Sequence, residues 1–266
     1  MKYALWLLLL CGAARAQSWL PVGRFPVGRV AQASLDPTGY LYVSDERGSM
    51  VRYDSLGTPV ARYSPPKVAE PSLLEAANPL QTFVFYRDFQ EFHFLDRFLN
   101  ASPTMRLPAD AVSFAAAATP AANGRLWVFD ATAFALLQWD LNARAVGAST
   151  PLDLALFGGA LDVNFMREYQ NQLFVNNRGG SVLVFDNFGN YRKQLPVACD
   201  FFGFRGSELY WLDGDQLRAM DLYTLQRRVL KLPALVNVER ALLSRQHLYL
   251  FSGDELFIYR DVAPRH

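Results

Sequence analysis

Six copies of one short pattern recur along this chain of 266 residues. Each copy is an apolar, aromatic-rich segment, a polar turn and a second segment that closes on Asp, as from Leu41 to Asp54. The other copies run from Phe83 to Asp96, Leu126 to Asp140, Leu173 to Asp186, Leu209 to Asp221 and Leu248 to Asp261. Their first residues follow one another at intervals of 36 to 47 residues. A period of about 40 residues with several strands per repeat is typical of a β-propeller. The sequence therefore predicts an all-β, six-bladed β-propeller with four antiparallel strands in each blade.

The two ends of the repeat array predict how the ring closes. The first repeat has four predicted strands, at 29–34, 40–44, 50–53 and 59–63, separated by turns such as Asp36-Pro37-Thr38-Gly39. The last repeat has only three predicted strands, between Asn237 and Tyr259, whereas Trp19 to Phe25 precede the first repeat. We expect Trp19 to Phe25 to form the outer strand of the sixth blade, because such closure removes exposed sheet edges.

Two local patterns refine this expectation. Ser181 to Phe185 alternate but are more uniformly apolar than a strand with one solvated face, as expected where neighbouring blades cover both faces of a sheet. Ala115 to Ala122 are rich in alanine and interrupted by Pro120. We interpret that segment as the end of a strand followed by a turn.

The first 16 residues have the pattern of a secretory signal peptide. Lys2 supplies a positive start, Ala4 to Leu10 form a short apolar run, and Ala14-Arg15-Ala16 fit a cleavage site with small residues. The run is shorter than a membrane-spanning helix requires. The sequence thus predicts a cleaved signal peptide over 1–16 and a single propeller domain over 17–266, located outside the cytoplasm in the periplasm or beyond the cell.

Charge and cysteine content exclude some classes of protein. Cleavage would remove Lys2 and Arg15 from 26 basic residues, leaving the chain close to neutral against 25 acidic residues. No basic stripe is present, which disfavours nucleic-acid binding. Cys199 would be the single remaining cysteine, so no internal disulfide is expected, and a buried, inert thiol is the simplest interpretation. We expect no cofactor and a monomeric protein.

The first repeat resembles a known family of propellers. Asp36-Pro37-Thr38-Gly39-Tyr40-Leu41-Tyr42-Val43-Ser44-Asp45, followed by Arg52 to Gly57, is similar to the NHL-type repeat of six-bladed propellers. Together with Leu95 to Asn100 and Phe185 to Tyr191, the chain resembles uncharacterised secreted propeller proteins of Bacteroidota. The resemblance covers nearly all of 17–266. It implies a fold and a secreted location, but no activity.

Acidic and amide residues return with the repeat, and turn chemistry explains most of them. They follow the second predicted strand of each blade at Asp45, Asp88, Asp130, Asn177, Asp213 and Asp254. Asp and Asn suit tight turns because their side chains bond to nearby backbone groups. The inner-strand positions Glu75, Asp162, Asn164, Asp200 and Glu239 are candidates for a metal-dependent hydrolase centre, although they form no recognisable ligand motif.

The polar residues that depart from the repeat lie in the fourth blade, and they are our candidates for ligand binding. Asp162, Asn164 and Arg167 are predicted on or near its inner strand, and Asn176, Asn177 and Arg178 on the next turn. Arg recognises carboxylates and phosphates through its planar fork. The alternative is a solvated loop in which Arg pairs with Asp.

Two classes of function stay open at this point. The first is a non-enzymatic binding or scaffold protein of the cell envelope with a protein or glycan partner, since loops on a rigid scaffold carry specificity. The second is a metal-dependent hydrolase or lyase with its site at the central channel. The fold alone does not choose between them.

Overall fold

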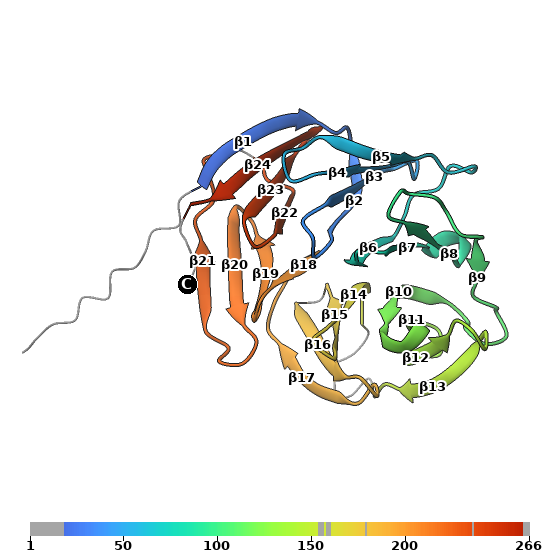
Figure 1. Ribbon diagram of the computed structural model, residues 1–266. Helices are drawn as coiled ribbons and strands as arrows, with labels where there is room; N and C mark the ends of the chain where they lie inside the picture. The colour runs from blue at the N-terminus through green and yellow to red at the C-terminus, as the bar shows by residue number, and fades with distance from the viewer. Residues whose placement is uncertain (1–18, 154–156, 158–160, 179, 236, 263–266) are drawn as a thin grey trace, which may run out of the picture.

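The computed structural model describes residues 19–153, 157, 161–178, 180–235 and 237–262, so the predicted signal peptide lies outside the described residues. Within these ranges, 24 strands form six antiparallel sheets of four strands each. The sheets are arranged as blades around a central axis (Figure 1). The predicted six-bladed β-propeller is confirmed.

The strands are numbered in chain order, and each blade begins with its inner strand. Blade 1 is β2 (Val30–Leu35), β3 (Leu41–Asp45), β4 (Met50–Tyr53) and β5 (Pro59–Tyr63); blade 2 is β6 (Leu73–Asn78), β7 (Gln81–Tyr86), β8 (Glu91–Asp96) and β9 (Met105–Arg106). Blade 3 is β10 (Ala115–Ala121), β11 (Arg125–Asp130), β12 (Ala135–Asp140) and β13 (Ala145–Pro151); blade 4 is β14 (Val163–Tyr169), β15 (Gln172–Asn177), β16 (Ser181–Asp186) and β17 (Tyr191–Leu195). Blade 5 is β18 (Phe202–Arg205), β19 (Glu208–Asp213), β20 (Gln216–Asp221) and β21 (Arg227–Leu230); blade 6 is β22 (Arg240–Leu243), β23 (His247–Ser252), β24 (Glu255–Asp261) and β1 (Trp19–Pro26). Two short 3-10 helices, η1 (Arg87–Phe89) and η2 (Ala122–Gly124), lie in the turns of blades 2 and 3.

The ring closes as the sequence predicts. Strand β1 pairs antiparallel with β24, in a register that runs from Trp19 opposite Asp261 to Pro26 opposite Glu255 (Figure 1). The Trp19 indole Nε1 also donates a hydrogen bond of 2.8 Å to the backbone carbonyl of Lys231 in the segment that follows blade 5. The N-terminal strand therefore completes blade 6.

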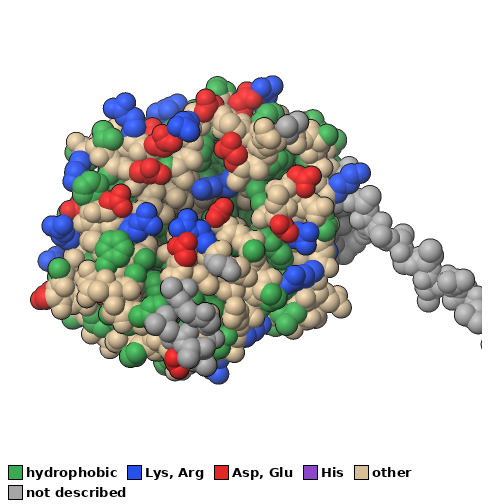
Figure 2. Space-filling model, turned by 180° about the vertical axis from the view of Figure 1, so that it is seen from behind, with side chains coloured by type: hydrophobic (Ala, Val, Ile, Leu, Met, Phe, Trp, Pro, Cys, Tyr) green, Lys and Arg blue, Asp and Glu red, His purple; other side chains and the backbone are tan. Residues whose placement is uncertain are grey.

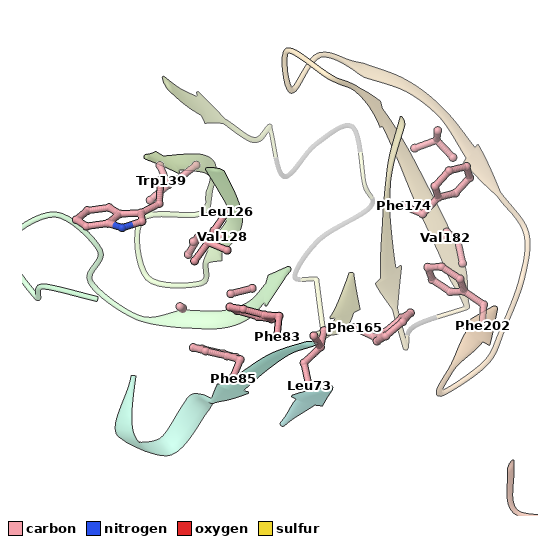
Figure 3. Packing of buried hydrophobic residues seen from close by; sticks show 14 of the residues in the cluster. Leu73, Phe83, Phe85, Leu126, Val128, Trp139, Phe165, Phe174, Val182 and Phe202 are labelled. Atoms are coloured by element: carbon pink, nitrogen blue, oxygen red, sulfur yellow. The ribbon is translucent and has the colours of Figure 1, made fainter. Parts of the chain in front are cut away.

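Apolar side chains fill the spaces between blades, which explains why many strands are apolar on both faces. Every residue of β16 is buried. The largest cluster joins blades 2 to 5, and Figure 3 shows part of it, with Phe83 and Phe85 of β7 near Leu126 and Val128 of β11. Burying such side chains contributes about 1.5–3 kcal/mol each, so contacts between blades supply much of the stability.

The registers correct two details of the repeat. In blade 1, Leu41 pairs with the residue just before the closing Asp. In blade 2 the residue with this pairing is Thr82, opposite Leu95, so the second copy begins one residue before Phe83. Ala115–Ala121 form the complete inner strand β10 rather than a strand end and a turn. Pro120 is accommodated because β10 is an edge strand, in which half of the backbone N–H groups face away from the neighbouring strand.

Asp residues at the ends of the third strands hold the turns to the fourth strands. In blades 1, 2 and 4, Oδ1 of Asp54, Asp96 and Asp186 accepts hydrogen bonds from the backbone N–H groups two and four residues later. In blades 3 and 5, Asp140 and Asp221 accept from the N–H groups two and three residues later. The closing Asp of the sequence repeat is therefore a turn residue in five blades.

The strand order gives the ring two different faces. One face carries the segments between blades and the turns between second and third strands, and we call it the connector face. The opposite face carries the other turns, and we call it the tip face. Figure 2 shows the connector face, where charged side chains of both signs lie near the middle.

Candidate functional site

A cavity of about 250 Å³ opens at the middle of the connector face. Its lining comes from the inner strands, or the residues just before them, in several blades, with one turn residue from blade 4: Gln32, Asn164, Asp200, Phe201, Glu239, Arg240 and the turn residue Arg178. Of the six blade 4 candidates, Asn164 and Arg178 line this cavity. Trp211 of β19 adds an apolar wall.

The other polar candidates on this side of blade 4 hold the cavity wall in position. Nδ2 of the buried Asn176 donates hydrogen bonds to Oδ1 of Asn164 (2.7 Å) and to the carbonyl of Cys199 (2.8 Å). Oδ1 of Asn177 accepts the backbone N–H of Asp162 at 2.9 Å. Asn176 and Asn177 are thus positioning residues behind the cavity.

Arg178 and Asp162 form a two-point ion pair at the rim. Nε and Nη2 of Arg178 lie 2.9 Å from the two carboxylate oxygens of Asp162, and this pairing raises the pKa of Arg178. Both side chains are about half exposed, so the pair contributes little to stability. This contact is the Arg–Asp pairing that the sequence left open as the alternative interpretation.

Arg167 lies apart from the other blade 4 candidates. Its guanidinium pairs with the buried carboxylate of Glu75 on β6, and its Nη2 lies 3.4 Å from Oγ of Ser34 on β2. Arg167 and Glu75 line a second cavity, of about 250 Å³, that shares no lining residue with the first. The six candidates therefore do not converge on one site, because Arg167 spans the channel to blades 1 and 2.

The proposed metal candidates are divided between different places. Glu75 pairs with Arg167 and Asp162 with Arg178, whereas Asn164, Asp200 and Glu239 line the connector-face cavity. Within the described residues, no group of three or more His, Cys, Asp or Glu side chains is arranged to hold a metal ion.

Two of the six recurring residues after the second strands, Asp45 and Asp130, accept hydrogen bonds within their own turns. Oδ1 of Asp45 accepts the N–H groups of Arg47 and Ser49, and Oδ1 of Asp130 accepts those of Thr132 and Ala133. Cys199 stays protonated at neutral pH because burial raises the pKa of its thiol to about 12.

His93 packs between blades 1 and 2, and it should make stability depend on pH. Its ring lies 5.6 Å from Tyr63 and 5.5 Å from Tyr86, and burial lowers its pKa to about 4. The unfolded chain takes up this proton near pH 6.5. The contribution of His93 to the free energy of unfolding should therefore be complete above pH 6.5. It should fall by on the order of 3 kcal/mol as the pH drops to about 4.

Urea denaturation of His93→Phe at several pH values tests this assignment. The substitution should flatten the pH profile between about 4 and 6.5. The half-buried His247 offers a control, because His247→Phe should leave most of the slope in place. A His93→Phe profile parallel to that of the unsubstituted protein would refute the role of His93.

Large apolar side chains stand exposed at the tips of turns on the tip face. Five of them, which we call the tip crown, are 60% to 75% exposed: Leu56, Leu80, Phe98, Phe188 and Tyr223. Each follows an Asp or Asn by two residues, and its N–H donates a hydrogen bond of 2.8–3.0 Å to that side chain. Four of the five occupy one repeated position in the turns between the third and fourth strands of blades 1, 2, 4 and 5, and Leu80 lies in the turn between the first two strands of blade 2.

The sequence reasoning missed the tip crown although a signal was present. It explained the Asp at the start of each turn and did not consider the side chain two residues later. That position needs no apolar residue for the turn itself, as Asn142 in blade 3 shows. The turn geometry therefore does not account for the apolar side chains at these positions.

Comparison with known proteins supports the fold and leaves the function open. The sequence matches no family model, and a search of curated proteins finds no match. Among solved structures, the Pan2 WD40 domain of Neurospora crassa has a TM-score of 0.65 at 10% identity, covering 93% of this chain and 96% of that one. BamB from Moraxella catarrhalis has a TM-score of 0.52 at 10% identity, covering 88% and 85%.

A third similar structure is the extracellular domain of a putative hybrid two-component system from B. thetaiotaomicron. It has a TM-score of 0.56 at 13% identity and covers 86% of this chain and 33% of that one. These likenesses show a β-propeller and do not confirm the NHL-type repeat or the resemblance to secreted Bacteroidota proteins. Among the described residues, no helix has the length and apolar character needed to cross a membrane.

Proposed function

We propose that this protein is an extracytoplasmic binding protein that docks a partner protein of the cell envelope on its tip face. The observation that carries the proposal is the tip crown, in which four blades present an exposed apolar side chain at one turn position. Interfaces are formed around buried apolar and aromatic anchors.

The turns that carry the tip crown are held rigid, which favours binding. The Asp or Asn hydrogen bond fixes the backbone of each apolar residue, and the turns also contact neighbouring blades. Nε2 of Gln138 donates to the carbonyl of Asn187 at 2.9 Å, and Nζ of Lys193 donates to that of Leu222 at 3.1 Å. A surface that is ordered before binding loses less conformational entropy on association.

The chemistry of the tip crown favours a protein over a glycan. Leu56, Leu80, Phe98 and Phe188 offer no hydrogen-bonding group, whereas sugars need several polar contacts. The extracytoplasmic location rests on the signal-peptide pattern of residues 1–16, and one of the similar structures is itself an extracellular domain.

We favour binding over the metal-dependent hydrolase or lyase because two of the candidate carboxylates, Glu75 and Asp162, are engaged in ion pairs. A metal centre would need several of them free and convergent. Glu75 and Asp162 instead neutralise Arg167 and Arg178 on different sides of the channel.

A paired set of variants tests the proposal. The purified protein is immobilised, its partner is isolated from the native envelope, and the affinity for that partner is measured. Phe98→Ser with Phe188→Ser should weaken binding by at least about thirtyfold, as expected for two interface anchors.

The matched control replaces two exposed valines of the outer strands, Val60 and Val229, which are 48% and 57% exposed. Val60→Ser with Val229→Ser should leave the affinity unchanged. If the control pair weakened binding as much as the tip-crown pair, or if neither had an effect, the tip face would not be the docking surface.

A further inference from the structure

The connector-face cavity contains an arginine whose charge no carboxylate neutralises. Nη2 of Arg240 donates a hydrogen bond of 3.1 Å to the carbonyl of Ala31, and its Nη1 lies 3.5 Å from Oε1 of Gln32. Across the described residues, no carboxylate oxygen lies within ion-pair distance of its guanidinium, unlike those of Arg167 and Arg178.

The surroundings of Arg240 make this charge costly. The side chain is half-buried on β22, and its guanidinium lies 5.5 Å from the centre of the Phe201 ring. Burial lowers the pKa of Arg240 to about 10, with no neighbouring carboxylate to raise it again. A partly buried cation without a counter-charge is costly, and its position at a cavity favours the binding of an anionic group there.

The same cavity also contains two carboxylates with little to neutralise them. The exposed side chain of Asp200 accepts no hydrogen bond from the residues that the structure describes. Its charge helps to raise the pKa of Arg178, which already pairs with Asp162. Oε1 of Glu239 accepts only the backbone N–H of Gly253, at 3.4 Å. Among the residues that the structure describes, the partly buried Arg240 and the exposed Asp200 and Glu239 therefore line one space without an ion pair.

Aromatic rings form the apolar part of the cavity. The Phe201 ring contacts the guanidiniums of both Arg240 and Arg167, at 5.5 and 5.9 Å. Trp211 lines the wall and is almost fully buried. A volume of about 250 Å³ accommodates a ligand on the scale of an amino acid or a dipeptide.

We propose that this cavity binds a small zwitterion, an amino acid or a short peptide, with its carboxylate on Arg240 and its ammonium group against Asp200 and Glu239. A simple anion would meet the two carboxylates, and a simple cation would meet Arg240. Only a ligand that carries both charges satisfies all three side chains, with its apolar part against Phe201 and Trp211.

Three related probes test this proposal on the unsubstituted protein. They are the dipeptide alanyl-phenylalanine, its N-acetyl derivative, which has no ammonium group, and its C-terminal amide, which has no carboxylate. Binding is measured by calorimetry and by the change in tryptophan fluorescence, to which Trp211 in the cavity wall contributes. The free dipeptide should bind at least about tenfold more tightly than either derivative, because each derivative loses the charged contacts at one end of the ligand.

Two variants test which side chain binds each charged end of the ligand. Arg240→Gln should lower the affinity for the dipeptide at least about tenfold, and Asp200→Asn should do so for the dipeptide but not for its N-acetyl derivative. Arg62→Gln, at an exposed position on β5, is the control and should change nothing.

Three results would overturn the proposal. They are no detectable binding of the free dipeptide, equal binding of the N-acetyl derivative, and unchanged binding by a folded Arg240→Gln protein. If Arg240→Gln does not fold, the comparison of the three probes on the unsubstituted protein still decides. The tip crown lies on the opposite face, so this outcome is separate from that of the docking experiment.

Discussion

Deleting Trp19–Pro26, with all other residues kept, should abolish the single cooperative unfolding transition of this protein. The deletion removes a strand that pairs with β24 along its length and exposes the edge of blade 6. It also removes Val22 and Phe25 from the cluster between blades 6 and 1. We expect a loss on the order of 5 kcal/mol or more from the lost hydrogen bonds and burial, measured by circular dichroism in urea.

A pair of glycine substitutions tests the same closure without removing a strand. A Cβ on Gly57, in blade 1, would lie 2.4 Å from Cε2 of Phe25 on β1, whereas a Cβ on Gly39 would meet no atom within 4 Å. Both glycines have positive φ, 84° and 98°, so both alanine variants lose about 1–2 kcal/mol to backbone strain. Gly57→Ala should lose distinctly more, because it also displaces Phe25.

Two results would contradict the role of β1 in closing the ring. An unchanged urea midpoint after deletion of Trp19–Pro26 would mean that β1 contributes nothing to the ring. Equal destabilisation by Gly57→Ala and Gly39→Ala would mean that the Phe25 contact is unimportant.

Breaking the ion pair between Glu75 and Arg167 should have the second largest effect. The Glu75 side chain is 4% exposed and that of Arg167 is 12% exposed, and together they join blades 2 and 4 across the channel. Removing one partner leaves the other charge buried, so Glu75→Gln or Arg167→Gln should each cost about 3–5 kcal/mol.

The double variant separates the pair from its surroundings. Glu75→Gln with Arg167→Gln should be less destabilised than the sum of the two single variants, because no unpaired charge remains. An exposed ion pair supplies the control: Glu255→Gln, which breaks the pair with Arg24, should change the free energy of unfolding by less than about 1 kcal/mol. Additive effects at Glu75 and Arg167 would contradict this account.

The repeat in the sequence was sufficient to predict the architecture. Strands Met50–Tyr53 and Pro59–Tyr63 begin and end where the turn residues predict, since Asp and Gly determine local backbone geometry. Ring closure followed from the missing strand of the last repeat. Ala115–Ala121 was misread because the position of a strand at the axis, which tolerates Pro120, is not a local property.

The candidate site was only partly predictable. Asn164 and Arg178 were found because they interrupt the repeat, and both line the connector-face cavity. Arg167 and Glu75 are 92 residues apart in sequence, and only the closure of the ring brings them together. Arg240 was not singled out because an isolated arginine on a strand shows neither its burial nor the lack of a carboxylate partner.

The central claim is that the tip face docks a protein, and site-specific crosslinking tests it most directly. A photoreactive phenylalanine analogue is placed at Phe188, which is 72% exposed on the tip crown, or at Val60, which is 48% exposed on the outer strand β5. Irradiation in the native envelope should give one discrete protein adduct from position 188 and none from position 60. Adducts from position 60 alone, or equal adducts from both positions, would contradict the claim.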